Sequence, residues 1–152
     1  MIYRLFAPVE TNVPPSELMA HLSAVGFIVE PHFRGDDLGW TGGTLVLPGG
    51  GTPVQLERWL TTEDDLRDDL NNHAAELETM TFNPHHTKLM ELVIQTKQLI
   101  AIRKPIDHAD DAGLTDLCEA MVHYFAGRLD AISQIDGEGW YSAAGELLLP
   151  EY

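Results

Sequence analysis

Short apolar segments with two different spacings follow one another along this chain. Around residues 2–7, 53–60 and 98–103 the apolar side chains are contiguous or fall at every second position, which is typical of β-strands. Around residues 15–25 and 111–129 they recur every third or fourth position, which is typical of helices with one buried side. Glycine or proline stands at many of the boundaries. With 44% hydrophobic and 22% charged residues, the chain has the composition of a globular protein, which excludes wholesale disorder, collagen-like repeats and coiled coils.

The remaining segments complete a mixed pattern. We expect further strands at residues 27–33, 44–47, 131–135, 140–141 and 146–149. Two more helices are expected, one capped by Thr62 and a shorter one opened by Asn83 and Pro84. The order of these elements predicts an α+β fold with a mainly antiparallel sheet and helices packed on one face, as in ferredoxin-like folds.

The length of 152 residues predicts one domain, spanning 1–152, with a single core. Within it, residues 1–60 and 97–149 show a similar order of strand, helix and two further strands. We interpret this order as a pseudo-duplicated βαββ arrangement. The alternative is that two common βαββ units arose independently, because the two halves share few identical residues.

The charge is the most unusual property of the sequence. The chain has 9 Lys and Arg against 24 Asp and Glu, which gives a net charge of −15. Nucleic-acid affinity depends on cationic side chains that displace counterions, so we expect no binding to nucleic acid and none to an anionic membrane. A charged partner is expected to be a basic protein or a metal cation.

Two features predict a cytosolic protein. Residues 1–8 lack the pattern of a signal peptide, and the chain has no apolar run near the roughly 18 residues that a membrane span needs. Cys118 is the only cysteine, so an intramolecular disulfide cannot form, in agreement with a reducing compartment. Cys118 falls within the apolar stripe of the helix at 111–129, and we expect it to be part of the core.

The helix expected after Thr62 is strongly acidic. Asp64, Asp65, Asp68 and Asp69 fall four residues apart in pairs, which places them on the outer surface of a helix. Such a surface is either an ordinary solvated face or a docking site for a basic partner.

Several turn and strand segments resemble a group of uncharacterised bacterial proteins of unknown function. The segments are residues 89–91, 95–98, 103–105, 134–141 and 145–149. The resemblance covers mainly residues 53–149. It implies a bacterial cytosolic protein and carries over no active site.

A metal site is the main catalytic alternative. His85 and His86 open one expected helix, while His108 and Asp111 open another, so converging helix ends could hold a divalent cation for a hydrolase. The alternative is that these residues are helix caps with solvated histidines beside them. The sequence has no His-Glu-x-x-His, Cys-x-x-Cys or calcium-loop motif.

Two glycine-containing segments have simpler interpretations than a ligand site. Residues 49–51 join two expected strands and lack the following lysine of a phosphate loop, so we interpret them as a hairpin turn. Trp140 and Tyr141 follow the turn at 136–139, where they either wall a ligand pocket or pack on the sheet.

These observations predict a non-catalytic binding domain that needs no cofactor. We expect its acidic surface to contact a protein partner or a second copy of the chain, with the metal-dependent hydrolase as the alternative function.

Overall fold

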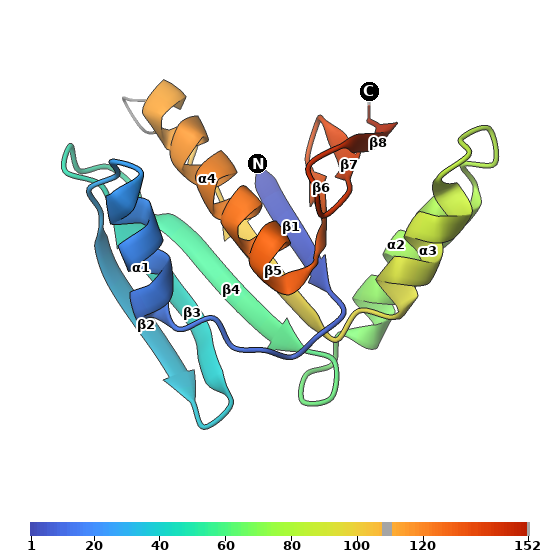
Figure 1. The fold of residues 1–152 in the computed structure, drawn as a ribbon, viewed down its shortest axis with the longest axis horizontal. Helices are drawn as coiled ribbons and strands as arrows, with labels where there is room; N and C mark the ends of the chain where they lie inside the picture. The colour runs from blue at the N-terminus through green and yellow to red at the C-terminus, as the bar shows by residue number, and fades with distance from the viewer. Residues whose placement is uncertain (108–110, 152) are drawn as a thin grey trace.

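The computed structural model describes residues 1–107 and 111–151, which form one eight-stranded sheet and four helices (Figure 1). The strands are β1 (Ile2–Ala7), β2 (Glu30–Asp36), β3 (Gly39–Val46), β4 (Val54–Leu60), β5 (Gln98–Arg103), β6 (Ile132–Ile135), β7 (Gly139–Tyr141) and β8 (Leu147–Pro150). The helices are α1 (Pro15–Ala24), α2 (Arg67–Glu78), α3 (His86–Ile94) and α4 (Asp111–Leu129). The predicted α+β fold is confirmed.

The strand order in the sheet is β2-β3-β4-β5-β1-β6-β7-β8, and each neighbouring pair is antiparallel. The strands at the centre, β1 and β5, are mostly buried, and Leu5 of β1 lies opposite Ile100 of β5. A strand that is covered on both faces of the sheet tends to have a near-continuous run of apolar residues, which explains the sequences of these two strands.

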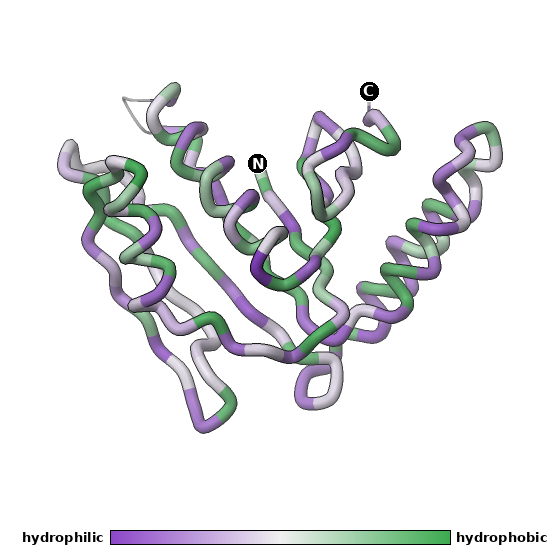
Figure 2. The backbone as a smooth tube through the Cα atoms, viewed as in Figure 1, coloured by the Kyte–Doolittle hydropathy of each residue, from purple (hydrophilic) through white to green (hydrophobic). Residues whose placement is uncertain are grey.

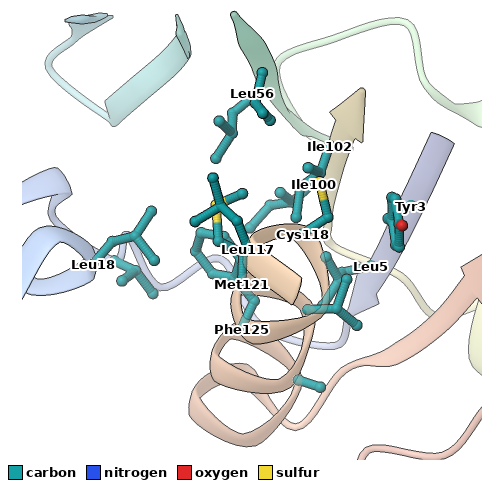
Figure 3. Close-up of a cluster of buried hydrophobic side chains, with 14 of the residues drawn as sticks. Tyr3, Leu5, Leu18, Leu56, Ile100, Ile102, Leu117, Cys118, Met121 and Phe125 are labelled. Carbon is teal, nitrogen blue, oxygen red and sulfur yellow. The ribbon is translucent and has the colours of Figure 1, made fainter. Parts of the chain in front are cut away.

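One face of the sheet is covered by α1 and α4. Side chains of β1 and β5 point toward the apolar side of α4. Figure 3 shows Cys118 of this helix beside Ile100, with Met121 and Phe125 on the side nearer to Leu18 of α1. Cys118 is fully buried in this cluster, so the core prediction is confirmed. Burial raises the pKa of its thiol to about 12.

The opposite face is covered by α2 and α3, which form an antiparallel pair that stands apart from α1 and α4 (Figure 1). Phe6 and Leu99 are sequence neighbours of Leu5 and Ile100, which belong to the cluster under α4. Phe6 and Leu99 themselves belong to a second cluster, formed with α2 and α3. Because successive strand residues point to opposite faces, this alternation places the two clusters on opposite sides of the sheet. The prediction that helices lie on one face therefore holds for α1 and α4 and is corrected for α2 and α3. Figure 2 shows apolar and polar residues alternating along these helices, as expected when each buries one side.

The predicted repetition of element order is present, since a strand, a helix and three strands occur before α2 and again after α3. Their places in the sheet differ. In the first run β2 lies at the edge and β3 and β4 return toward the centre, whereas β6 lies beside β1 and β7 and β8 continue outward. A common origin of the two runs stays a prediction.

A buried arginine joins the sheet to two loops. Arg58 of β4 is 4% exposed, and its Nε donates a hydrogen bond to Gln98 Oε1. Its guanidinium nitrogens also donate to the backbone oxygens of Leu38 (3.1 Å), Trp40 (3.0 Å) and Glu10 (3.2 Å). A buried cation loses the water around it, and these four hydrogen bonds compensate Arg58 for that loss.

The segment at 49–51 is a turn between β3 and β4, as predicted, with Gly50 and Gly51 at φ angles of 78° and 84°. Within the described part of the chain, no helix has both the length and the apolar character required to cross a membrane.

Candidate functional site

A hollow of about 260 Å³ lies between α4 and strands β6 and β7. α4 contacts both β1 and β6, and Ser133, Ile135 and Tyr141 lie on the face of the sheet that this helix covers. We call the hollow the α4–β7 pocket. It is lined by Glu119, Val122, His123 and Ala126 of α4, by Ser133, Ile135, Glu138 and Tyr141, and by Ser142 and Gly145 of the turn before β8.

The charged groups of the α4–β7 pocket are acidic. Glu119 enters from α4 and Glu138 from the turn before β7, and the described lining residues include no lysine or arginine. Tyr141 Oη donates a 2.9 Å hydrogen bond to Glu138 Oε1. Burial raises the pKa of Tyr141, as do this hydrogen bond and the charges of Glu138 and Glu119, so the phenol keeps its proton. The pocket therefore has a negative potential at neutral pH.

The hydroxyl group of a buried residue, Ser133, also faces this pocket. Ser133 lies on β6 directly opposite Tyr141 of β7, and its residue is only 2% exposed. No hydrogen bond of Ser133 Oγ is found in the described part of the chain, and this atom is not among the fully buried polar atoms that lack a partner, so it reaches the surface of the pocket. An oxygen at the pocket surface without a partner in the protein can accept a hydrogen bond from a group that enters the pocket.

The remaining wall is apolar. Val122 and Ala126 of α4 face Ile135 of β6, and the ring of Tyr141 closes one side. The exposed imidazole of His123 lies against Gly145, where an added Cβ would be 3.6 Å from His123 Cε1. The pocket thus combines an apolar wall with oxygen atoms from three elements of the fold.

The two aromatic residues expected to wall one ligand pocket point to opposite faces of the sheet. Tyr141 lines the α4–β7 pocket, whereas Trp140 packs against Phe6 at a ring distance of 5.2 Å and near His73 at 6.1 Å. Trp140 borders a different hollow of about 360 Å³, together with Met80 and Phe82 near the loop between α2 and α3. The alternation of side chains along β7 is the reason for this separation.

The structure does not bring the predicted metal ligands together. His85 and His86 lie at the start of α3, and Asp111 lies at the start of α4, on the other side of the molecule (Figure 1). Asp111 pairs with Lys104 at 2.8 Å, and a ring nitrogen of His86 is 2.7 Å from the backbone oxygen of Asn83. His108 lies outside the described residues. The expected convergence of the two helix ends is therefore wrong.

Among the residues that the structure describes, no three histidine, cysteine, aspartate or glutamate side chains are grouped so that they could hold a metal ion. This statement includes Glu119, His123 and Glu138 of the α4–β7 pocket.

The predicted acidic residues are all exposed, but two of them precede the helix. α2 begins at Arg67, with Asp68 and Asp69 in its first turn. Asp64 lies in the preceding turn, where its Oδ2 accepts a 2.9 Å hydrogen bond from the backbone N–H of Leu60. The predicted four-residue pairing of these acids on one helix is therefore corrected.

Sequence reasoning did not single out Glu119, Ser133 and Glu138. The spacing of Glu119 and His123, one helical turn apart beside the buried stripe of α4, was a signal for the first. Ser133 and Glu138 gave no comparable signal, because their position depends on the pairing of β6 with β7.

Comparison with protein-family models, with curated proteins and with solved structures gives no match to this chain.

Proposed function

We propose that this chain is a non-catalytic, cytosolic interaction domain that binds a basic protein partner through its acidic surface. The observation that supports the proposal is the distribution of charge between interior and surface. Four of the basic side chains are neutralised by carboxylates, in the pairs Arg4–Asp136, Arg103–Glu57, Lys104–Asp111 and Arg128–Glu17. A fifth, Arg58, is buried. Since the whole chain carries a net charge of −15, the surface is left with a large excess of carboxylates.

The electrostatic field of this surface selects partners by the sign of their charge. It attracts and orients a positively charged protein, accelerates its association at low salt, and repels polyanions. Self-association through the same surface would bring like charges together, so the proposal names a partner of opposite charge.

The densest exposed group of acids surrounds the start of α2. We call Asp65, Asp68 and Asp69 the α2 acidic group. Residues 61–82 contain seven acids and one base, for a local charge of 1 − 7 = −6. Asp64 is not included, because its hydrogen bond to Leu60 supports the turn.

The test compares two triple variants of equal net charge. One neutralises the α2 acidic group as Asp65→Asn, Asp68→Asn and Asp69→Asn. The control variant is Glu30→Gln, Asp37→Asn and Asp116→Asn, which changes three exposed carboxylates elsewhere. Both retain the folded α+β structure by circular dichroism, although the loss of Asp68 and Asp69 from the first turn of α2 costs about 0.3–1 kcal/mol each.

The probe is an oligolysine peptide, titrated by calorimetry at low and at physiological salt. We expect the α2 variant to weaken binding about tenfold at low salt and the control variant to weaken it much less. Equal weakening in both variants would show that only net charge matters, and it would refute the assignment of a docking face to α2.

A further inference from the structure

We propose that the α4–β7 pocket binds a small organic cation with N–H donors on an apolar stem, the chemistry of a lysine or arginine side-chain end. The pocket lies on the face of the sheet that carries α4, opposite the face covered by α2 and α3. The proposal is therefore independent of the α2 acidic group, and neither depends on the other.

The first support is the arrangement of charge. Glu119 and Glu138 reach the pocket from different elements, and no lysine or arginine lines it within the described residues. Both carboxylates act on the phenol of Tyr141, whose pKa is raised first by burial and then by Glu138 and Glu119. Two carboxylates near one phenol form a site that favours a cation over an anion or a neutral group.

The second support is Ser133. Its side chain lies on the pocket side of β6, because Ser133 pairs with Tyr141, which also lines the pocket. The residue is 2% exposed. No hydrogen bond of its hydroxyl is found in the described part of the chain, and since Oγ is not among the fully buried atoms that lack a partner, it reaches the pocket surface. An ammonium group has three N–H donors, and Ser133, Glu119 and Glu138 supply three groups that can accept them.

The third support is the match between pocket size and an apolar stem. A volume of about 260 Å³ is below the roughly 300–1,000 Å³ of typical small-molecule sites, so one side-chain end fits better than a larger ligand. Val122, Ala126 and Ile135 provide the apolar wall along which an alkyl chain can lie. A hydrated metal ion would leave this wall unused.

The experiment is a two-dimensional NMR titration of the full chain with four small probes that differ in charge and in the number of N–H donors. They are butylammonium, butylguanidinium, tetramethylammonium and butyrate. We expect one of the first two to bind with a dissociation constant on the order of 1 mM and to shift the backbone amides of Glu119, Ser133, Glu138 and Tyr141. The stronger of the two identifies the side chain, lysine or arginine, that the pocket prefers.

Three variants assign the interaction, and a fourth serves as the control. Glu119→Gln and Glu138→Gln should each weaken binding at least about fivefold, because the amide keeps the shape and removes the charge. Ser133→Ala should weaken it about threefold and leave thermal stability unchanged, since no hydrogen bond of its hydroxyl is found within the described part of the fold. Glu146→Gln changes an exposed carboxylate outside the lining residues and should have no effect.

Three outcomes would overturn the proposal. They are the absence of localised shifts with both N–H cations, equal binding of butyrate, or unchanged binding in both Glu→Gln variants. If tetramethylammonium binds as tightly as butylammonium, the N–H donors contribute nothing and the role given to Ser133 is refuted.

Discussion

Replacing Arg58 by methionine tests how the sheet is held to its loops. The substitution keeps an unbranched apolar stem and removes all the donors of the guanidinium group. It leaves the side-chain oxygen of Gln98 and the backbone oxygens of Leu38, Trp40 and Glu10 without this partner.

The expected loss follows from these four hydrogen bonds. A buried acceptor that loses its partner costs about 1–3 kcal/mol, so four acceptors could cost about 4–12 kcal/mol. Two effects reduce the loss. Two of the acceptors, the backbone oxygens of Leu38 and Glu10, lie in loops that can regain water, and the desolvation penalty of the buried cation disappears in the variant. We therefore expect a decrease of about 3–4 kcal/mol in the free energy of unfolding, a large share of the 5–15 kcal/mol typical of a domain.

The assay is equilibrium unfolding in urea, followed by circular dichroism. With an m-value of about 2 kcal/mol/M, the midpoint should fall by about 1.5–2 M without a change in m. Arg103→Met is the matched control. Arg103 is 44% exposed at its side chain and pairs with Glu57 at 2.8 Å, so its loss should cost less than about 1 kcal/mol.

Arg58→Lys separates charge from geometry. A lysine keeps the positive charge but cannot place donors at four acceptors in different directions, so it should lose about 2–3 kcal/mol. Equal midpoints for Arg58→Met and Arg103→Met would refute the reasoning, because the buried network would then contribute no more than a surface ion pair.

Three further changes give smaller or opposite effects. Tyr3→Phe should leave the free energy of unfolding unchanged or raise it by about 1 kcal/mol in thermal unfolding, because Tyr3 Oη is buried without a hydrogen-bond partner among the described residues; a clear loss would contradict this. Cys118→Ser should lower the free energy of unfolding by about 1–3 kcal/mol, and the native thiol should react slowly with a thiol reagent; rapid labelling would show that Cys118 is accessible. Partial burial opposes the ionisation of Asp136, but hydrogen bonds from Arg4 and from a backbone N–H outweigh it and hold the pKa of Asp136 below its ordinary value. A carboxyl group of this kind adds stability at neutral pH that is lost as the pH falls through the lowered pKa, so the difference between wild type and Asp136→Asn should shrink below about pH 4 in urea titrations; a difference that grows on acidification would reverse the assignment.

Elements with a strong internal period were predicted at their observed positions. The stripe from Leu114 to Leu129 and the apolar run 98–103 agree with α4 and β5. Their own sequences specify how they are buried. A long helix with one apolar side packs that side on the core, and an apolar strand lies inside the sheet.

The edge strand β2 was predicted about three residues too early. Phe27, Ile28 and Val29 have the highest strand propensity in this region, yet they form the connection after α1, where the N–H of Phe27 bonds to the oxygen of Leu22. The strand itself is the exposed segment Glu30–Asp36, whose position is set by pairing with β3. Propensity alone misplaces such a strand because cross-strand pairing outweighs it.

The start of α2 was misplaced for a similar reason. The acidic residues after Thr62 favour a helix N-terminus, but Asp64 is used to close the turn that follows β4. Aspartate competes for backbone N–H groups in turns as readily as it caps helices, and the sequence does not distinguish these two uses.

The α4–β7 pocket shows which information is missing from a single sequence. Glu119, Ser133 and Tyr141 lie on three different elements, and each is unremarkable in its own segment. They meet because Ser133 pairs with Tyr141 and because α4 lies along one side of that pair. A shift of one residue in this register would turn Tyr141 to the face occupied by Trp140 and would remove both the phenol and its bond to Glu138 from the pocket. The chemistry of the site therefore depends on a pairing between two strands of four and three residues, a property of the folded sheet that neither segment specifies alone.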